Sequence, residues 1–255
     1  MILSRHYWSL IWYQSLSDLR AEAAKGFLGI LWWVLEPVLY MAAFYVVFTV
    51  LKQREDDAVQ FLLSGLVVWK WFAGSVGQGT NSIIKGAGLM RQVYIPKFVF
   101  PCVSIVSNTF KFLIVFLLLL LFLFVAGTQF SLAWFTLPLL LVIEFLFVAA
   151  VVTFVAAITP FLPDVKVVIN NLVMLMFFLS GVIFDISKAP DELKFYLYLN
   201  PMTTLVEDFR LVLLEGVFPE WQPLVLISTV SILGLVGSGY ILTRFDRVYP
   251  KRILR

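Results

Sequence analysis

The sequence predicts an all-α integral membrane protein with six transmembrane helices. Apolar residues make up 61% of the 255 residues and charged residues only 14%, against about 45–50% and about 25% in an average soluble domain. Much of this apolar surface must therefore face lipid. The apolar runs are each long enough for a spanning helix, which takes roughly 20 residues. No room is left for a large soluble domain, such as a complete nucleotide-hydrolysing domain.

The six expected spans belong to a single transmembrane domain. They are expected at about residues 27–51, 59–82, 100–125, 134–159, 167–184 and 223–242. Residues 1–25 carry apolar side chains at helical spacing, with Trp8 and Trp12 among polar positions. This pattern is typical of an amphipathic helix in the membrane interface. Such a helix either anchors the N-terminus only or also contacts a cytoplasmic partner.

Two segments between the spans do not cross the membrane. Glycine and proline interrupt residues 83–99, which lie between spans two and three. Residues 185–221 form the longest polar stretch and are expected to fold as an external, re-entrant helical hairpin. One of its helices starts at Pro190. The other has Asn200 as N-cap and Pro201 at its first position, and it ends at Gly216.

The distribution of lysine and arginine predicts the orientation. The segments on one side of the membrane (1–26, 83–97, 160–166 and 244–255) carry twelve of these residues, and the segments on the other side carry five. Cytoplasmic loops are richer in lysine and arginine. Both termini are therefore expected in the cytoplasm, as an even number of spans requires.

Four ionisable residues fall inside expected spans: Glu36, Lys70, Lys111 and Glu144. Each costs about 2.5–3.5 kcal/mol on insertion scales when it is unpaired at the bilayer centre. Opposed pairs, Glu36 with Lys70 and Lys111 with Glu144, would remove this cost. Alternatively, each lysine extends independently to the interface or faces a wet cavity.

Aromatic residues make up 16% of the chain and gather near the ends of the spans. An interfacial aromatic belt explains many of them. Others are candidates for a path along which a sugar chain slides, because the apolar faces of pyranose rings stack on aromatic rings. The candidates for this path are Trp32, Trp33, Tyr40, Trp69, Trp71 and Phe72.

Several kinds of catalytic or binding site are not expected, because the sequence does not contain the residues that they need. The sequence contains no Walker A motif, and it has one histidine and one cysteine, so neither a metal site nor histidine-based catalysis is expected. Gly77 and Gly79 do not fit a dinucleotide-binding motif. They are better explained by close packing between membrane helices.

Four segments in order along the chain resemble a known family. They are GFLGILWWVLEPVL at 26–39, LMRQVYIPKFVFP at 89–101, the Pro163-Asp164 turn and NPMTTLVEDFR at 200–210. Together they resemble the permease subunit of bacterial ABC exporters for polysaccharides, which serve O-antigen, capsule and teichoic acid export. The resemblance covers essentially the whole chain.

The resemblance implies a function and partners. Two copies of the chain would enclose a path for a lipid-linked polysaccharide, such as O-antigen, across the bacterial inner membrane. Two copies of a separate subunit would bind ATP and Mg²⁺ and hydrolyse the nucleotide, so this chain would be no enzyme and hold no cofactor. No nucleic acid is expected as a partner.

The resemblance also implies roles for individual residues. Coupling to the ATPase would use Lys85, Gly86, Leu89, Arg91 and Asp164. Asp164 departs from the family pattern, because relatives often carry arginine where Pro163 stands. The hairpin would gate the path through Asn200, Pro201, Phe209 and Arg210.

Two other functions stay open from the sequence. Related permeases of the same topology export small molecules or drugs. An integral-membrane glycosyl- or acyltransferase would need polar catalytic residues clustered at one interface, and the sequence offers none at a recognisable spacing.

Overall fold

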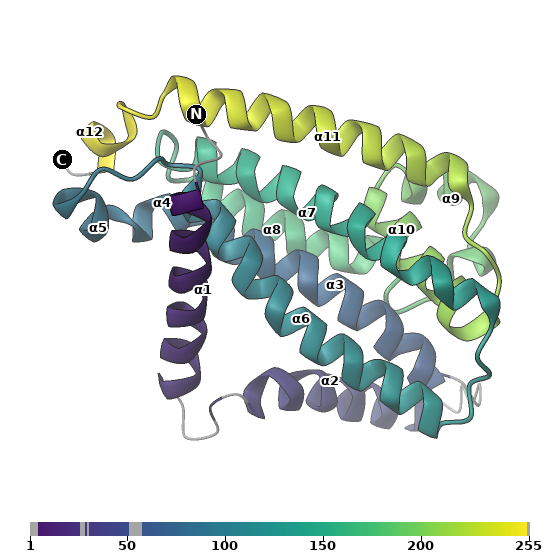
Figure 1. Cartoon of the computed structure of the whole chain (residues 1–255). Helices are drawn as coiled ribbons and strands as arrows, with labels where there is room; N and C mark the ends of the chain where they lie inside the picture. The colour runs from purple at the N-terminus through teal and green to yellow at the C-terminus, as the bar shows by residue number, and fades with distance from the viewer. Residues whose placement is uncertain (1–4, 26–28, 30, 51–57, 254–255) are drawn as a thin grey trace.

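Figure 1 shows the computed structural model of the chain, which describes residues 5–25, 29, 31–50 and 58–253 as helices and the turns that join them. The elements in chain order are α1 (Arg5–Lys25), α2 (Leu31–Val50), α3 (Ala58–Thr80), α4 (Ser82–Lys85), α5 (Ala87–Gln92), α6 (Val99–Val125), η1 (Leu132–Thr136), α7 (Leu137–Ile158), α8 (Val165–Leu179), η2 (Ile186–Lys188), α9 (Asp191–Tyr198), α10 (Pro201–Arg210), η3 (Leu211–Glu215), α11 (Trp221–Arg244) and α12 (Tyr249–Ile253).

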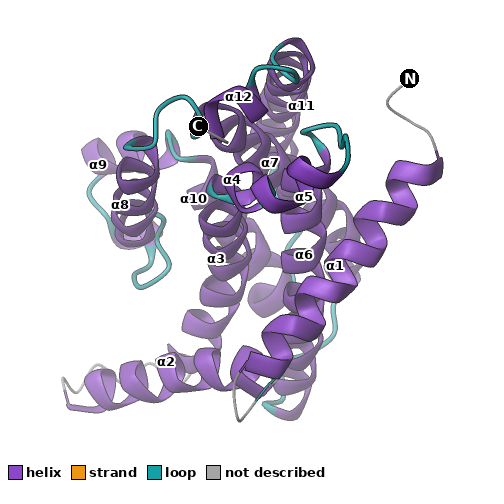
Figure 2. Cartoon of the chain, turned by 90° about the vertical axis from the view of Figure 1, so that its left-hand side faces the viewer, coloured by secondary structure: helices purple, strands orange, loops and turns teal. Residues whose placement is uncertain are grey.

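The long helices α3, α6, α7, α8 and α11 run along one common axis (Figure 1). The short helices α4, α5 and α12 gather at one end of this bundle, which we call the α5 end. Helices α9 and α10 lie at the opposite end, the hairpin end. Helix α1 crosses the bundle steeply at the α5 end and packs against α6 (Figure 2). This direction is the one that a helix lying in the membrane interface would take.

Within the part of the chain that the structure describes, four stretches are long and apolar enough to cross a membrane: α3, α6, η1 together with α7, and α11. Helix α2 has 20 residues. Helix α8, expected as a span over 167–184, has only 15, or about 22 Å at 1.5 Å per residue. It ends early because Gly181, with a φ of 66°, turns the chain. The total of six spans stays a prediction.

The second helix of the expected hairpin is part of the core. Helix α10 buries eight of its ten residues, among them Phe209, and it packs mainly on α3. Helix α9 buries none of its residues. The predicted ends are confirmed: the Asn200 side chain accepts a hydrogen bond from the Met202 amide at 3.1 Å, and Gly216 follows η3 with a φ of 67°.

Close packing of α3 on α7 depends on a glycine. A Cβ at Gly79 would lie 2.4 Å from Cγ1 of Val152, whereas a Cβ at Gly77 would meet nothing within 4 Å. Close helix contact therefore explains Gly79. The same explanation is wrong for Gly77 within the described part of the chain.

Replacing Gly79→Ala should lower the free energy of unfolding by about 1–3 kcal/mol, because the added methyl group forces α3 and α7 apart. Gly77→Ala is the matched control. It should be neutral or stabilising by up to about 1 kcal/mol, since alanine is the better helix former. Thermal unfolding of both purified variants measures the difference, and equal losses of stability would contradict the packing assignment.

Candidate functional site

A polar groove lies between α1 and α2 on one side and α3 and α6 on the other. It consists of two cavities, of about 410 and about 580 Å³, which share Glu22 and Gln78 in their walls. It extends from Lys85, beside α5, to Val115 on α6. The polar residues in its walls are Gln14, Asp18, Glu22, Glu36, Lys70, Gln78, Ser82, Lys85, Ser104, Asn108 and Lys111. We call this feature the polar groove.

Two ion pairs cross the polar groove. Lys70 Nζ donates a hydrogen bond to Glu36 Oε1 at 2.5 Å and joins α3 to α2, as the sequence predicts. Lys111 Nζ donates to Glu22 Oε2 at 2.5 Å and joins α6 to α1. The Lys111 ammonium also lies 5.7 Å from the centroid of the Trp33 ring. Both pairs thus connect a flanking helix to the central bundle.

The expected pair between Lys111 and Glu144 is wrong. Helix α1 packs along α6 and supplies a different carboxylate to Lys111, that of Glu22. Glu144 is fully buried on α7, and neither of its carboxylate oxygens has a hydrogen-bond partner among the described residues. An isolated charge is very costly in such surroundings.

Two amide side chains complete the polar groove. Asn108 Nδ2 donates hydrogen bonds to Gln78 Oε1 and to the Ser104 carbonyl, both at 2.8 Å. These two residues and Glu22 were not predicted from the sequence as site residues. The presence of Gln78 and Asn108 inside apolar spans could have indicated this contact, since membrane helices use amide groups to bind one another.

Three of the aromatic path candidates belong to the core. Trp69, Trp71 and Phe72 are only 3–4% exposed. Trp71 stacks on Phe112 with ring centroids 4.0 Å apart, and Phe72 stacks on Phe147. Neighbouring helices of the same chain thus cover most of each ring, although Trp71 still borders the polar groove. The place of these three rings along a path stays a prediction.

The remaining path candidates lie on α2. Trp33 lines the polar groove. Trp32 is 48% exposed and does not line it. Tyr40 lies outside the side chains that the structure describes. The geometry therefore leaves Trp33 as the aromatic candidate with both exposure and polar neighbours.

The predicted coupling residues lie at the α5 end. Lys85 and Arg91 are exposed, at the ends of α4 and α5. Gly86 joins these two helices, and Leu89 packs against a second apolar cluster beneath them. Asp164 occupies the exposed turn before α8. Their role in coupling stays a prediction.

The C-terminal segment clamps the loop that follows α5. The Asp246 carboxylate accepts hydrogen bonds from the Tyr94 hydroxyl at 2.7 Å and from the Lys97 amide at 2.9 Å. The first of these bonds raises the pKa of Tyr94. The fully buried Tyr249 donates to the carbonyl of Ala157, at the end of α7, at 3.0 Å. The loop, the tail and α7 are thus connected.

Arg210 pins the hairpin to the bundle. Its buried guanidinium donates to the carbonyls of Phe61 at 3.0 Å and of Gly181 and Val182 at 2.7 Å each. It also lies 3.5 Å from the centroid of the Phe61 ring. One side chain therefore holds α10, the start of α3 and the turn after α8 together. Pro201, also predicted as a gate residue, occupies the first position of α10.

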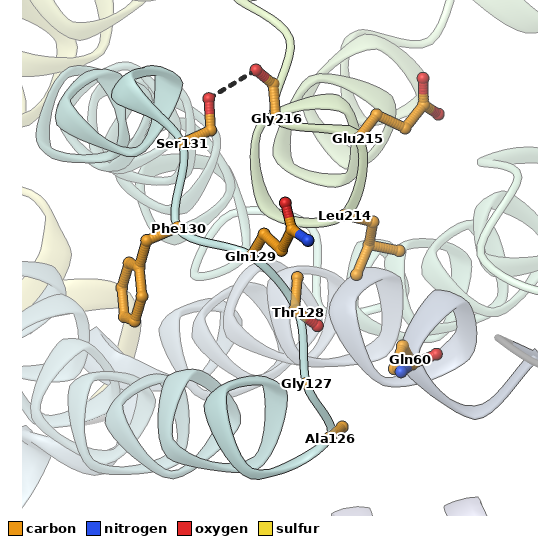
Figure 3. A pocket seen from close by; sticks show the side chains of 10 residues that line it. All are labelled: Gln60, Ala126, Gly127, Thr128, Gln129, Phe130, Ser131, Leu214, Glu215 and Gly216. Atoms are coloured by element: carbon orange, nitrogen blue, oxygen red, sulfur yellow. Dashed lines mark hydrogen bonds between the residues drawn. The ribbon is translucent and has the colours of Figure 1, made fainter.

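A second pocket, of about 580 Å³, opens at the hairpin end (Figure 3). Figure 3 shows the loop after α6 facing the last turn of η3, with Gln129 between them. The Ser131 hydroxyl donates to the Gly216 carbonyl at 2.7 Å and ties the two segments together. This pocket and the polar groove lie toward opposite ends of the bundle.

Asp208 is a buried acid within the hairpin. It is 3% exposed, and its Oδ2 has no hydrogen-bond partner among the described residues. Burial raises the pKa of Asp208 to about 7, against a smaller opposing effect of a hydrogen bond from the Glu220 backbone. The folded hairpin therefore holds a proton that an unfolded chain, with a pKa of about 3.9, releases. The stability of the fold should decrease as the pH rises from about 4 to about 7.

Asp208→Asn removes this ionisation. The variant should gain stability on the order of 3 kcal/mol at pH 8 but only about 1 kcal/mol at pH 5, because the gain follows the shifted titration. Thermal unfolding at the two pH values measures it. Asp191→Asn, at an exposed acid of α9, is the control and should give no such gain. An equal effect of Asp208→Asn at both pH values would contradict the buried-acid assignment.

Comparison with known proteins agrees with the resemblance seen in the sequence. The ABC-2 type transporter family matches residues 6–214, from α1 into η3. The O-antigen export system permease protein RfbA of Myxococcus xanthus is 31% identical over 88% of this chain and 87% of its own length. RfbA of Klebsiella pneumoniae is 26% identical over 86% of each chain. The polysialic acid transport protein KpsM of Escherichia coli is 25% identical over 90% of this chain and 91% of its own. The chain belongs to the ABC-2 type transporter family.

Proposed function

We propose that the chain is the membrane permease of an ATP-driven exporter that moves a lipid-linked polysaccharide, such as O-antigen, across the bacterial inner membrane. The observation that carries this proposal is the similarity to three export or transport proteins for polysaccharides over at least 86% of each chain. The family match over residues 6–214 includes most of α1, both groove walls and most of the hairpin. A shared small soluble module could not produce such coverage.

ATP hydrolysis belongs to a separate partner. Two copies of an ATP-binding subunit, carrying ATP and Mg²⁺, dock on two copies of this chain from the cytoplasm. The exposed Lys85 and Arg91 at the α5 end support this docking site. The bias of lysine and arginine toward the same end supports a cytoplasmic position for it and for both termini.

A movement of the loop after α5, caused by the docked ATPase, can be transmitted to the helix bundle through direct contacts. The loop after α5 is joined through Asp246 to the C-terminal tail, and Tyr249 joins the tail to α7. At the other end, Arg210 connects α10 to α3 and to the turn after α8. The hairpin then acts as the gate of the path, since it changes position together with these helices.

Purification of the chain with candidate ATPase subunits tests the proposal. A stable complex with ATP-dependent export of a lipid-linked polysaccharide is expected. A complex that forms but moves only small hydrophobic molecules would support the drug-export alternative. Failure to bind any ATPase would overturn the exporter assignment.

Arg91→Glu should reduce export by roughly tenfold or more while the complex still hydrolyses ATP, because a reversed charge disturbs the docking surface. Arg91→Lys keeps the charge and should retain most of the export. ATPase activity and transport are measured together in reconstituted vesicles, and thermal unfolding shows whether the fold is intact. Unchanged export by Arg91→Glu would exclude the α4–α5 segment as the coupling element.

A further inference from the structure

The polar groove is unusual because it lies among helices that cross the membrane. Its walls on α3 and α6 belong to two of the four candidate spans. Polar groups at membrane depth need polar partners, since lipid chains offer none. The two cavities, about 410 and about 580 Å³, fall within the ~300–1,000 Å³ typical of small-ligand sites. The polar groove therefore has the size and chemistry of a binding site for a polar ligand.

The charges of the described side chains in the polar groove balance. These side chains are three acids and three lysines: Asp18, Glu22, Glu36, Lys70, Lys85 and Lys111. Two of the lysines already bind carboxylates at 2.5 Å. A phosphate group would have to displace these carboxylates, and a cation would meet the ammonium groups. The charge balance thus favours a neutral polar ligand over an ionic one.

The polar groove contains both hydrogen-bond donors and acceptors. The carboxylates and the Asn108 carbonyl oxygen accept, whereas the lysines and the Gln78 amide nitrogen donate. Trp33 adds an aromatic ring to the same wall. Sugar hydroxyl groups are both donors and acceptors, and the apolar face of a pyranose ring packs on an aromatic ring. A neutral sugar matches this combination better than a headgroup with a single charge.

We infer that the polar groove is a sugar-binding site, which receives a neutral sugar residue of the transported polysaccharide. Trp33 supplies the stacking surface, and Glu22, Glu36, Gln78 and Asn108 bind hydroxyl groups. The groove extends from the α5 end, where the proposed ATPase docks, so it serves substrate that is loaded from the cytoplasmic side. The inference rests on the proposed function and adds to it the location and chemistry of a substrate contact.

Photocrosslinking of the full-length chain in lipid nanodiscs tests the inference. The probe is an uncharged alkyl disaccharide with a diazirine on its sugar, and no glycoside detergent is used in the preparation. Mass spectrometry should locate the crosslinks on the walls of the polar groove, near Trp33 and Asn108. An excess of unlabelled alkyl disaccharide should suppress them. A polyprenyl phosphate without a sugar should not suppress the crosslinks.

Variants make the assignment specific. Trp33→Ala should weaken labelling between about threefold and about tenfold, the range expected for loss of an aromatic contact. Trp221→Ala removes a half-exposed ring at the start of α11 and should leave labelling unchanged. Glu36→Gln leaves the groove with one excess positive charge, so polyprenyl phosphate should now compete.

Three outcomes would overturn the inference: crosslinks outside the groove, equal effects of Trp33→Ala and Trp221→Ala, or effective competition by polyprenyl phosphate in the unsubstituted chain. The last would identify an anion site instead. Assembly with the ATPase is measured on the same preparation. A chain that assembles with the ATPase and exports polysaccharide, but binds no sugar in the groove, would refute this inference alone.

Discussion

The cost of a charged or polar group at membrane depth determines how the peripheral helices of this chain are placed. Glu22 on α1 and Glu36 on α2 each bind a lysine of the central bundle. Without these partners, Lys70 and Lys111 would each be an unpaired charge at membrane depth, which costs about 2.5–3.5 kcal/mol on insertion scales. The two pairs hold the flanking helices beside α3 and α6 and keep the polar groove between them. Helix position and groove chemistry thus have the same cause.

The same constraint explains the hairpin end. Arg210 is buried, yet its guanidinium satisfies three backbone carbonyls and covers an aromatic ring. The carbonyls of Gly181 and Val182 lie in the turn that ends α8, where backbone acceptors lack helical partners, and the Phe61 carbonyl lies in the first turn of α3. A single buried cation therefore replaces missing backbone hydrogen bonds and joins three elements.

Local features of the fold could be predicted from the sequence. Asn200, Pro201 and Gly216 mark the ends of the second hairpin helix through short-range geometry, and the spacing of apolar residues near the N-terminus predicts the helix α1. The position of α1 in the membrane interface stays a prediction. The burial of Trp69, Trp71 and Phe72 could not be predicted, because a membrane helix that is apolar all round does not reveal which face meets protein. The early end of α8 was missed because apolar residues continue past Gly181.

The partner of Lys111 illustrates the remaining difficulty. Glu144 lies on a neighbouring span and is the simpler choice from the sequence, whereas Glu22 is 89 residues away from Lys111 and belongs to an interfacial helix. Only the packing of α1 across α6 makes that pair possible. The amides of Gln78 and Asn108 were visible as polar residues in apolar runs, but their meeting depends on the register of α3 against α6.

A double-mutant cycle on Glu22 and Lys111 tests most directly whether ion pairs at membrane depth hold the flanking helices. Unfolding of Glu22→Gln, Lys111→Met and the double variant would be compared in the same lipid nanodiscs. If the two side chains stabilise the fold through each other, the loss of stability in the double variant should be smaller than the sum of the two single losses, by about 0.5–3 kcal/mol. Strictly additive losses would show that the two side chains act independently, and they would contradict the account.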